Sequence, residues 1–205
     1  MGSTRIIKIV LLFMVTCTVA FAALTIDLPA PLFSATGLDG AMVNLVDLRG
    51  QTVILEWTNA ECPYVKKHYQ RGSLPRLQKS AHLRNIVWLQ VIAMVSGAKG
   101  EQIRITKLPV EDSASNIFLD TEGRLSRLYG AQTTPQIYII NSDGVLVYQG
   151  AVDNIASQYQ ADIPTAENYI SAALADLAEG KKVAKSNTQP YGCPVIAQAW
   201  SSLLK

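Results

Sequence analysis

A nearly continuous run of apolar residues from Thr52 to Trp57 constrains the fold of this chain most strongly. Such a run is typical of a central β-strand that is covered on both faces, because an exposed face would carry alternating polar residues. A second run spans residues 86–94, and a shorter one spans residues 117–120. Stretches with helical spacing lie between and after these runs. Together they predict an α/β domain with a mixed central sheet flanked by helices.

Turn signals and helical periodicity predict the remaining elements. Leu38-Asp39-Gly40 separates two short alternating segments and predicts an N-terminal hairpin. A second hairpin is expected from strands at 135–140 and 145–150, joined by an Asn-Ser-Asp-Gly turn. Residues 96–112 are polar and predict a loop. Helices are expected over residues 63–77 with a kink at Gly72, over residues 123–129, and over residues 165–179.

The first 22 residues have the pattern of a cleaved secretory signal peptide. Arg5 and Lys8 precede a short apolar run, and Ala20 and Ala22 form an Ala-x-Ala cleavage site. A retained membrane anchor is the alternative, although the run is shorter than the roughly 20 residues that span a bilayer. We therefore expect export to the periplasm or the extracellular space, with no membrane contact after cleavage. The expected parts are a signal peptide at 1–22, a domain at 23–180 and a tail at 181–205.

Cleavage of this segment changes both the charge and the cysteine count. Removing its two basic residues leaves 16 basic and 16 acidic residues, which argues against a broad basic surface for nucleic acid. It also removes Cys17, so that Cys62 and Cys193 remain. Because oxidising compartments favour disulfides, these two cysteines are expected to pair. An idle Cys193 on a flexible tail is the alternative.

Two motifs carry a resemblance to a known family. Residues 59–69 read Asn-Ala-Glu-Cys-Pro-Tyr-Val-Lys-Lys-His-Tyr and follow the first buried strand, and Thr133-Thr134-Pro135 precedes a later strand. Over about residues 26–197 the chain resembles the redoxin branch of the thioredoxin superfamily. This branch includes the alkyl hydroperoxide reductase/thiol-specific antioxidant proteins, and the peroxiredoxin-like members are the most similar. The resemblance implies a thioredoxin fold, a reactive thiol at a helix N-terminus, and a cis peptide bond at Pro135 facing that thiol.

The chain departs from the family patterns at two places. Val65 stands where a thioredoxin Cys-x-x-Cys motif has its second cysteine, so no local disulfide can form. Leu55 and Asn59 stand where peroxiredoxins carry a proline and a peroxide-polarising threonine. Whether the substrate is a peroxide or a protein disulfide therefore stays open.

Cys62 is the predicted nucleophile. At the start of a helix, unpaired N–H groups and the helix dipole stabilise its thiolate, and Lys66 on the same helical face adds positive charge. Thr134 is expected to offer backbone hydrogen bonds to an incoming substrate chain. The expected substrate-binding residues are Pro63, Lys66, Thr134 and Pro135.

Other polar and aromatic residues receive structural interpretations. His68 is six residues after the nucleophile and on a different helical face, so we interpret it as a surface histidine. Arg124 and Arg127 are candidate anion or peroxide partners, although solvated helix charges are the favoured interpretation. Trp57 is expected in the core. The chain has no Gly-rich phosphate loop and no Cys/His set with metal spacing, so no metal or organic cofactor is predicted.

The sequence thus predicts a thiol-dependent oxidoreductase. Cys62 attacks a disulfide or a peroxide, Cys193 resolves the product, and an external thiol reductant reopens the bridge. Because the chain between the two cysteines is long, the tail is expected to move to bring Cys193 in. One alternative is a non-catalytic binding or structural module with a permanent Cys62–Cys193 disulfide. A weaker one is a one-cysteine peroxidase in which Cys193 is idle.

Overall fold

The computed structural model describes residues 24–93 and 116–195. The expected signal peptide and the polar stretch at 96–112 lie outside these described residues.

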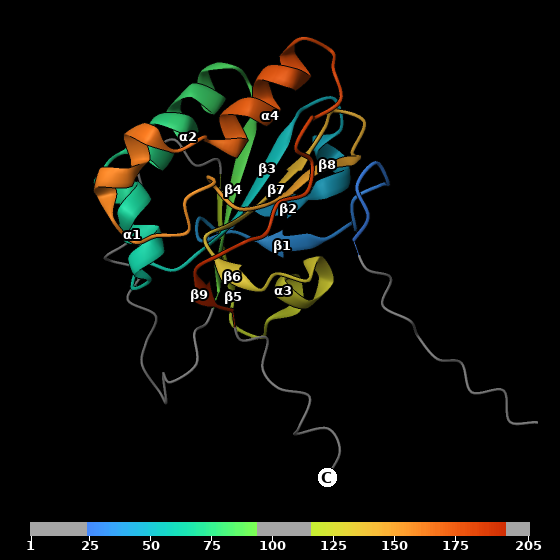
Figure 1. Ribbon diagram of the computed structural model, residues 1–205. Coiled ribbons are helices and arrows are strands. Elements are labelled where there is room, and N and C mark those ends of the chain that lie inside the picture. The colour runs from blue at the N-terminus through green and yellow to red at the C-terminus, as the bar shows by residue number, and fades with distance from the viewer. Residues whose placement is uncertain (1–23, 94–115, 196–205) are drawn as a thin grey trace, which may run out of the picture.

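A five-stranded mixed sheet in the order β5-β4-β3-β7-β8 forms the centre of the domain (Figure 1). β4 lies parallel to both β3 and β5, whereas β7 runs antiparallel to β3 and β8 antiparallel to β7. This arrangement confirms the predicted α/β fold with a mixed sheet. The strands are β3 (Val53–Thr58), β4 (Val87–Ala93), β5 (Asn116–Asp120), β7 (Gln136–Ile140) and β8 (Leu146–Gly150).

β3 is buried along its whole length because a hydrophobic core lies on each face of the sheet. Leu55 and Trp57 point into one core, which also contains Phe118. Ile54 points into the other core with Val65. The continuous apolar run in the sequence is therefore explained by two cores that share one strand.

Helices cover one face of the sheet, and a hairpin with one short helix covers the other (Figure 1). The first face carries α1 (Pro63–Gln70), α2 (Ser73–Leu83) and α4 (Tyr169–Ala178). The second carries α3 (Arg124–Tyr129) and the expected N-terminal hairpin of β1 (Ser34–Thr36) and β2 (Met42–Asn44). Among the described residues, the 3₁₀ helices η1 (Leu45–Leu48) and η3 (Gln160–Thr165) lie in the connections.

Several helix boundaries differ from the expected ones, and α2 continues to Leu83, beyond the expected end at residue 77. The expected kink at Gly72 is a complete break, because Gly72 has a φ of +74° and separates α1 from α2. The last helix was expected from residue 165 but begins at Tyr169. Pro164 lies within η3, and the Asn168 side chain caps α4 by accepting a hydrogen bond from the amide of Ser171.

The described part of the tail lies along the edge of the sheet, beside β8. The amide of Gln149 in β8 donates to the carbonyl of Ser186, and the amide of Thr188 donates back to the carbonyl of Gln149, at 2.9 and 3.0 Å. The segment then reaches β9 (Cys193–Pro194), which pairs antiparallel with β6 (Thr133–Thr134). The sequence predicts that the tail moves to bring Cys193 to Cys62. In this structure the tail is already paired with β6, so any such movement would begin with its release from β6.

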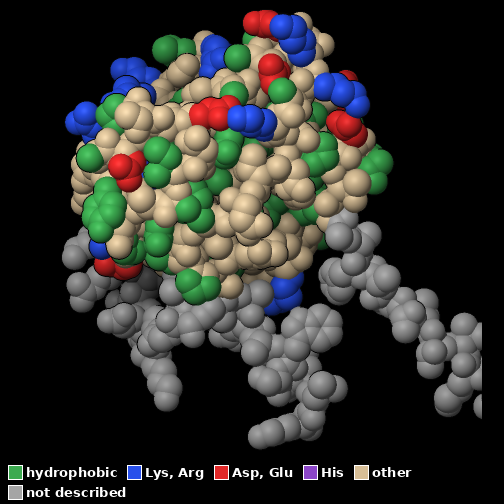
Figure 2. All heavy atoms as spheres, in the orientation of Figure 1, with side chains coloured by type: hydrophobic (Ala, Val, Ile, Leu, Met, Phe, Trp, Pro, Cys, Tyr) green, Lys and Arg blue, Asp and Glu red, His purple; other side chains and the backbone are tan. Residues whose placement is uncertain are grey.

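Charged side chains of both signs lie beside one another on the face shown in Figure 2. The described residues include exposed ion pairs, such as Lys182 with Asp27 and Lys185 with Glu167. Among the residues that the structure describes, no helix has the length and apolar character needed to cross a membrane. Within the same ranges, no group of three or more His, Cys, Asp or Glu side chains is placed to hold a metal ion.

Candidate functional site

Cys62 lies at the N-terminal end of α1, just after the central strand. β3 ends at Thr58, and the chain turns at Asn59, whose carbonyl accepts a 3.0 Å hydrogen bond from the amide of Cys62. Pro63 takes the first helical position, where a missing N–H removes no helical hydrogen bond. The site therefore presents the sulfur to free N–H groups and to the positive end of the helix dipole, both of which stabilise a thiolate.

The Thr134–Pro135 peptide bond faces this cysteine and is cis, as expected. The Sγ atom of Cys62 lies 3.1 Å from the carbonyl oxygen of Thr134. Both residues are buried, with Cys62 2% exposed and Thr134 0% exposed. The two motifs, 72 residues apart in sequence, thus meet at one place.

Cys62 is bonded to Cys193 in a disulfide whose Cα atoms are 5.9 Å apart. The disulfide expected from the sequence is therefore present. Cys193 lies opposite Thr134 in the β6–β9 pairing. The C-terminal segment consequently occupies the position beside Thr134 that was expected for a substrate chain.

Gly192 allows the main chain of the tail to approach Thr134 closely. Its φ is +140°, a value that side chains rarely permit, and a Cβ atom there would lie 2.0 Å from the carbonyl oxygen of Thr134. The carbonyl carbon would be 2.7 Å away, so the clash is with backbone and not with a flexible side chain. Sequence reasoning misses this requirement because it arises only from the pairing with a distant segment.

The sequence model of the AhpC/TSA family matches residues 26–149, which is more than half of the chain. The chain belongs to the AhpC/TSA family. This finding confirms the resemblance drawn from the two motifs, and the family and the fold together support oxidoreductase chemistry in general. No curated protein matches the sequence.

Several solved structures resemble this AhpC/TSA family member in fold. A hypothetical protein from Sinorhizobium meliloti is 18% identical, with a TM-score of 0.68 over 87% of this chain and 97% of its own. An uncharacterized conserved protein from Geobacillus kaustophilus is 23% identical, with a TM-score of 0.68 over 85% and 94%. The thioredoxin domain of a thiol-disulfide oxidoreductase from Bacteroides vulgatus is 17% identical, with a TM-score of 0.51 over 70% and 98%. These likenesses confirm the thioredoxin fold.

Lys66, expected to support the Cys62 thiolate, forms an ion pair with Glu61 in this family member. Its Nζ atom lies 3.2 Å from the Glu61 carboxylate, and the two side chains are 44% and 69% exposed. The neighbouring carboxylate therefore offsets part of the positive charge that Lys66 brings to the start of α1. Solvent screening weakens the charge further.

His68 was expected at the surface but is buried, with 1% of its area exposed. It lies three residues after the buried Val65, on the same face of α1, and that spacing is the sequence signal for its burial. Its Nε2 atom is 3.8 Å from a carboxylate oxygen of Asp153. Burial lowers the pKa of His68 to about 4, because it outweighs the opposing effect of Asp153, and nearby Lys67 adds to the decrease. His68 is therefore neutral at neutral pH.

Lys67, which sequence reasoning did not single out, forms a buried ion pair with Asp153. The two charged atoms are 3.3 Å apart, and the side chains are 0% and 2% exposed. Lys67 also donates a 2.9 Å hydrogen bond to the carbonyl oxygen of Ile155. Asp153 accepts hydrogen bonds from the amide of Ile155 and from the hydroxyl of Tyr191 in the tail. α1 and the tail thus contact the same buried ion pair.

A second buried polar cluster surrounds Glu56 on β3. Its carboxylate accepts a 2.7 Å hydrogen bond from Tyr69, a 2.8 Å bond from Trp88 and a 3.0 Å bond from Gln78. Gln90 contacts the same carboxylate at 3.4 Å. Burial raises the pKa of Glu56, although these hydrogen bonds oppose the shift. The continuous apolar run of the sequence gives no sign that its one acid is held by four side chains from α1, α2 and β4.

The raised pKa of Glu56 predicts a pH-dependent stability. Protons bind the folded state more tightly than the unfolded state, so the protonated form adds stability below the ordinary pKa of about 4.5. This contribution is lost as the pH rises through the folded pKa. Urea unfolding at a series of pH values should show the decrease, and Glu56→Gln should remove it. An equally steep decrease in Glu56→Gln would assign the effect to another group.

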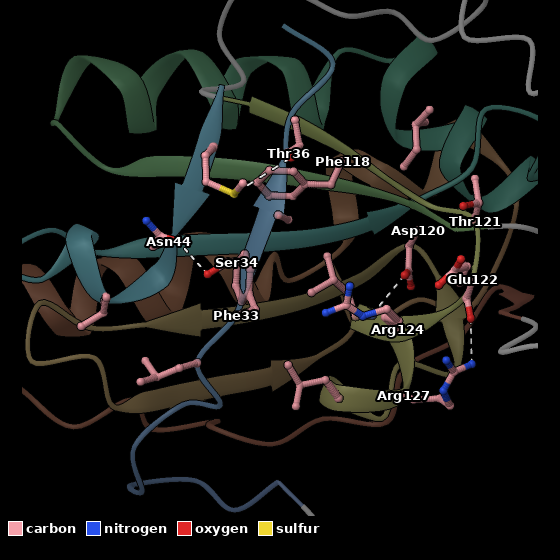
Figure 3. Close-up of a pocket in the computed structure, with 17 residues that line it drawn as sticks. Phe33, Ser34, Thr36, Asn44, Phe118, Asp120, Thr121, Glu122, Arg124 and Arg127 are labelled. Carbon is pink, nitrogen blue, oxygen red and sulfur yellow. Dashed lines mark hydrogen bonds between the residues drawn. The ribbon is translucent and has the colours of Figure 1, made fainter. Parts of the chain in front are cut away.

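A groove of about 1110 Å³ lies on the opposite face of the sheet from α1 (Figure 3). Phe33 and Phe118 line it together with residues of α3, including Arg124 and Arg127. Arg127 donates a 2.8 Å hydrogen bond to the carbonyl of Glu122. Neither cysteine of the disulfide lines this groove, so the two arginines lie away from the candidate nucleophile.

Proposed function

We propose that this AhpC/TSA family member is an exported thiol–disulfide oxidoreductase with Cys62 as nucleophile and Cys193 as resolving thiol. One observation carries the proposal. An extended peptide segment, β9, lies along the Thr133–Thr134 edge, and its cysteine is bonded to Cys62. A site that holds such a segment from its own chain has the form needed for a cysteine-containing segment of another protein.

The reaction begins with the reduced dithiol. The Cys62 thiolate attacks one sulfur of a substrate disulfide, forms a mixed disulfide and releases one substrate thiolate. The Cys193 thiolate then attacks Cys62 Sγ, closes the bridge and releases the second substrate thiolate. The substrate gains two electrons and the dithiol loses two. An external thiol reductant returns them by the reverse exchange.

The residues around the disulfide support the substrate-binding roles expected for them. The buried Thr134 presents its main chain to the paired segment, and the cis bond at Pro135 directs this edge toward Cys62. Pro63 fixes the start of α1 and thus the direction of the thiolate. Lys66 contributes a long-range positive charge that its pairing with Glu61 weakens.

Rapid mixing of the reduced protein with a glutathionylated peptide tests the assignment of both cysteines. Cys62→Ser should leave only uncatalysed exchange, because no thiolate remains at the helix N-terminus. Cys193→Ser should react once and then stop, with one peptide or one glutathione bound per protein on Cys62 by mass spectrometry and the other thiol released. Full activity of Cys62→Ser would exclude Cys62 as the nucleophile.

Peroxide reduction is the second candidate function, supported by the family. In that reaction the Cys62 thiolate attacks a peroxide oxygen, forms a sulfenic acid and releases an alcohol or water. Cys193 then displaces hydroxide from the sulfenic acid to close the same bridge. Rapid peroxide consumption that survives Cys193→Ser would favour a one-cysteine peroxidase over the proposed exchange.

The ordered tail favours a third candidate, a permanent structural disulfide. A redox titration separates this possibility from turnover. A potential below about −300 mV indicates a structural bridge, whereas a higher potential suits a bridge that opens in each cycle.

Export is part of the proposal and is supported by the basic start, short apolar run and Ala-x-Ala site of residues 1–22. A disulfide in the folded domain agrees with an oxidising compartment. Mass spectrometry of protein recovered from outside the cytoplasm should show a chain that begins at Ala23. A chain that keeps residues 1–22 would contradict cleavage.

A further inference from the structure

Tyr191 joins the tail to the body of the domain two residues before Cys193. Its ring packs edge-on against Tyr64 of α1, with the ring centroids 5.8 Å apart. The Nζ atom of Lys67 lies 5.6 Å from the centroid of the same ring, a distance at which cation–π attraction acts. Tyr191 therefore contacts the helix that carries Cys62 at its N-terminus.

The hydroxyl of Tyr191 reaches the buried ion pair behind this helix. It donates a hydrogen bond to Asp153 and lies 3.5 Å from the Nζ atom of Lys67. Burial raises the pKa of Tyr191, and the nearby carboxylate of Asp153 raises it further, so the hydroxyl keeps its proton and remains a donor. A hydrogen bond to a charged group in such a setting is stronger than one between neutral groups.

These contacts do not depend on the disulfide. Tyr64 and Lys67 belong to α1, and Asp153 follows β8, so the docking surface for Tyr191 is built from the central domain and not from the tail. None of these contacts includes a sulfur atom, so reduction of the bridge removes none of them directly. A tethered thiol of this kind has a high effective concentration at its target.

We propose that Tyr191 is a positioning residue for Cys193. Its ring on Tyr64 and its hydroxyl on the Lys67–Asp153 pair anchor the tail at residue 191 while the bridge is open and β9 leaves the Thr134 edge to a substrate. Cys193 then resolves each Cys62 adduct within the same chain. This inference rests on the proposed roles of the two cysteines. It adds that the contacts of Tyr191 with α1 and Asp153 set the rate at which Cys193 attacks the Cys62 adduct.

A chromogenic aryl disulfide separates the two steps in the reduced full-length mature protein. Attack by Cys62 forms a mixed disulfide with one aryl group and releases the first coloured thiolate. Attack by Cys193 on Cys62 Sγ closes the bridge and releases the second coloured thiolate. Stopped-flow absorbance therefore records a first phase for Cys62 and a second phase for closure.

Two variants divide the contacts of Tyr191. Tyr191→Phe removes the hydroxyl and keeps the ring, and Tyr191→Ala removes both. Because a hydrogen bond to a charged group contributes about tenfold in an equilibrium, we expect the second phase to slow by about tenfold in Tyr191→Phe and further in Tyr191→Ala. The first phase should be no slower than in the unmodified protein. Tyr159→Ala, which removes an exposed tyrosine, is the matched control and should change neither phase.

The two phases also separate this inference from the proposed function. A second phase in Tyr191→Phe as fast as in the unmodified protein would overturn the positioning role while leaving the cysteine roles intact. A first phase in Cys62→Ser as fast as in the unmodified protein would instead contradict the proposed function. Equal slowing of both phases in Tyr191→Phe would indicate a general structural role and would also overturn the inference.

Discussion

Gly192→Ala should prevent the tail from closing normally on Cys62. The new Cβ atom would lie 2.0 Å from the carbonyl oxygen of Thr134, so the β6–β9 pairing could not form in its present geometry. The backbone at residue 192 would also be strained, since its φ of +140° suits glycine. Strain of this kind costs about 1–3 kcal/mol, so the equilibrium between dithiol and disulfide should shift toward the dithiol by roughly 10- to 100-fold.

A redox titration with a glutathione or dithiothreitol couple measures this shift. Gly180→Ala is the matched control, because Gly180 also has a positive φ, of +67°, but a Cβ atom there would meet nothing within 4 Å. The control should leave the thiol–disulfide equilibrium unchanged while lowering overall stability slightly. If Gly192→Ala titrates like the unmodified protein, the close approach to Thr134 does not govern bridge formation.

Lys67→Met should destabilise the fold far more than Lys66→Met, although the two lysines are adjacent. Lys67 is paired with Asp153 in the interior, so its removal leaves a buried carboxylate without its partner. Breaking a buried pair in this way costs about 3–5 kcal/mol of unfolding free energy. Lys66 is paired with Glu61 at the surface, where an ion pair contributes about 0–1 kcal/mol.

Urea unfolding of both variants in the oxidised state measures this difference with the disulfide intact. A companion variant, Asp153→Asn, removes the other charge of the buried pair and should also be strongly destabilised, because Lys67 then remains buried without a counter-charge. Similar unfolding free energies for Lys67→Met and Lys66→Met would show that the interior pair adds little to stability.

The parts of the fold that local sequence patterns determine were predictable. The apolar run at residues 52–57 is the central strand because its period marks burial on both faces. α3 ends at Gly130, where the positive φ that the glycine suggested is present. Cys62, Pro63 and the cis bond at Pro135 were found because the family motif spans them. In each case the signal lies within a few neighbouring residues.

The parts that depend on distant partners were not predictable in the same way. His68 lies three residues after Val65 and therefore on the buried face of α1. The prediction considered only its spacing of six residues from Cys62, and it was wrong. Nothing in the sequence near Lys67 distinguishes it from an exposed helix lysine. Its partner, Asp153, comes from the distant loop after β8. From the sequence the tail is interpreted as polar and mobile, because the main chain that holds it belongs to distant strands, at Gln149 of β8 and Thr134 of β6. Such tertiary contacts leave no periodicity in the sequence.

The disulfide also has a consequence for the life of the protein between turnovers. It joins residues 131 apart in sequence, so the covalent ring encloses most of the domain. By chain-entropy reasoning, a ring of this size disfavours the unfolded ensemble by about 5 kcal/mol. In the proposed cycle, a reductant removes that restraint each time it regenerates the dithiol. The protein that is ready to react is thus the form most open to unfolding and to proteases, and a scarcity of substrate would shorten its lifetime.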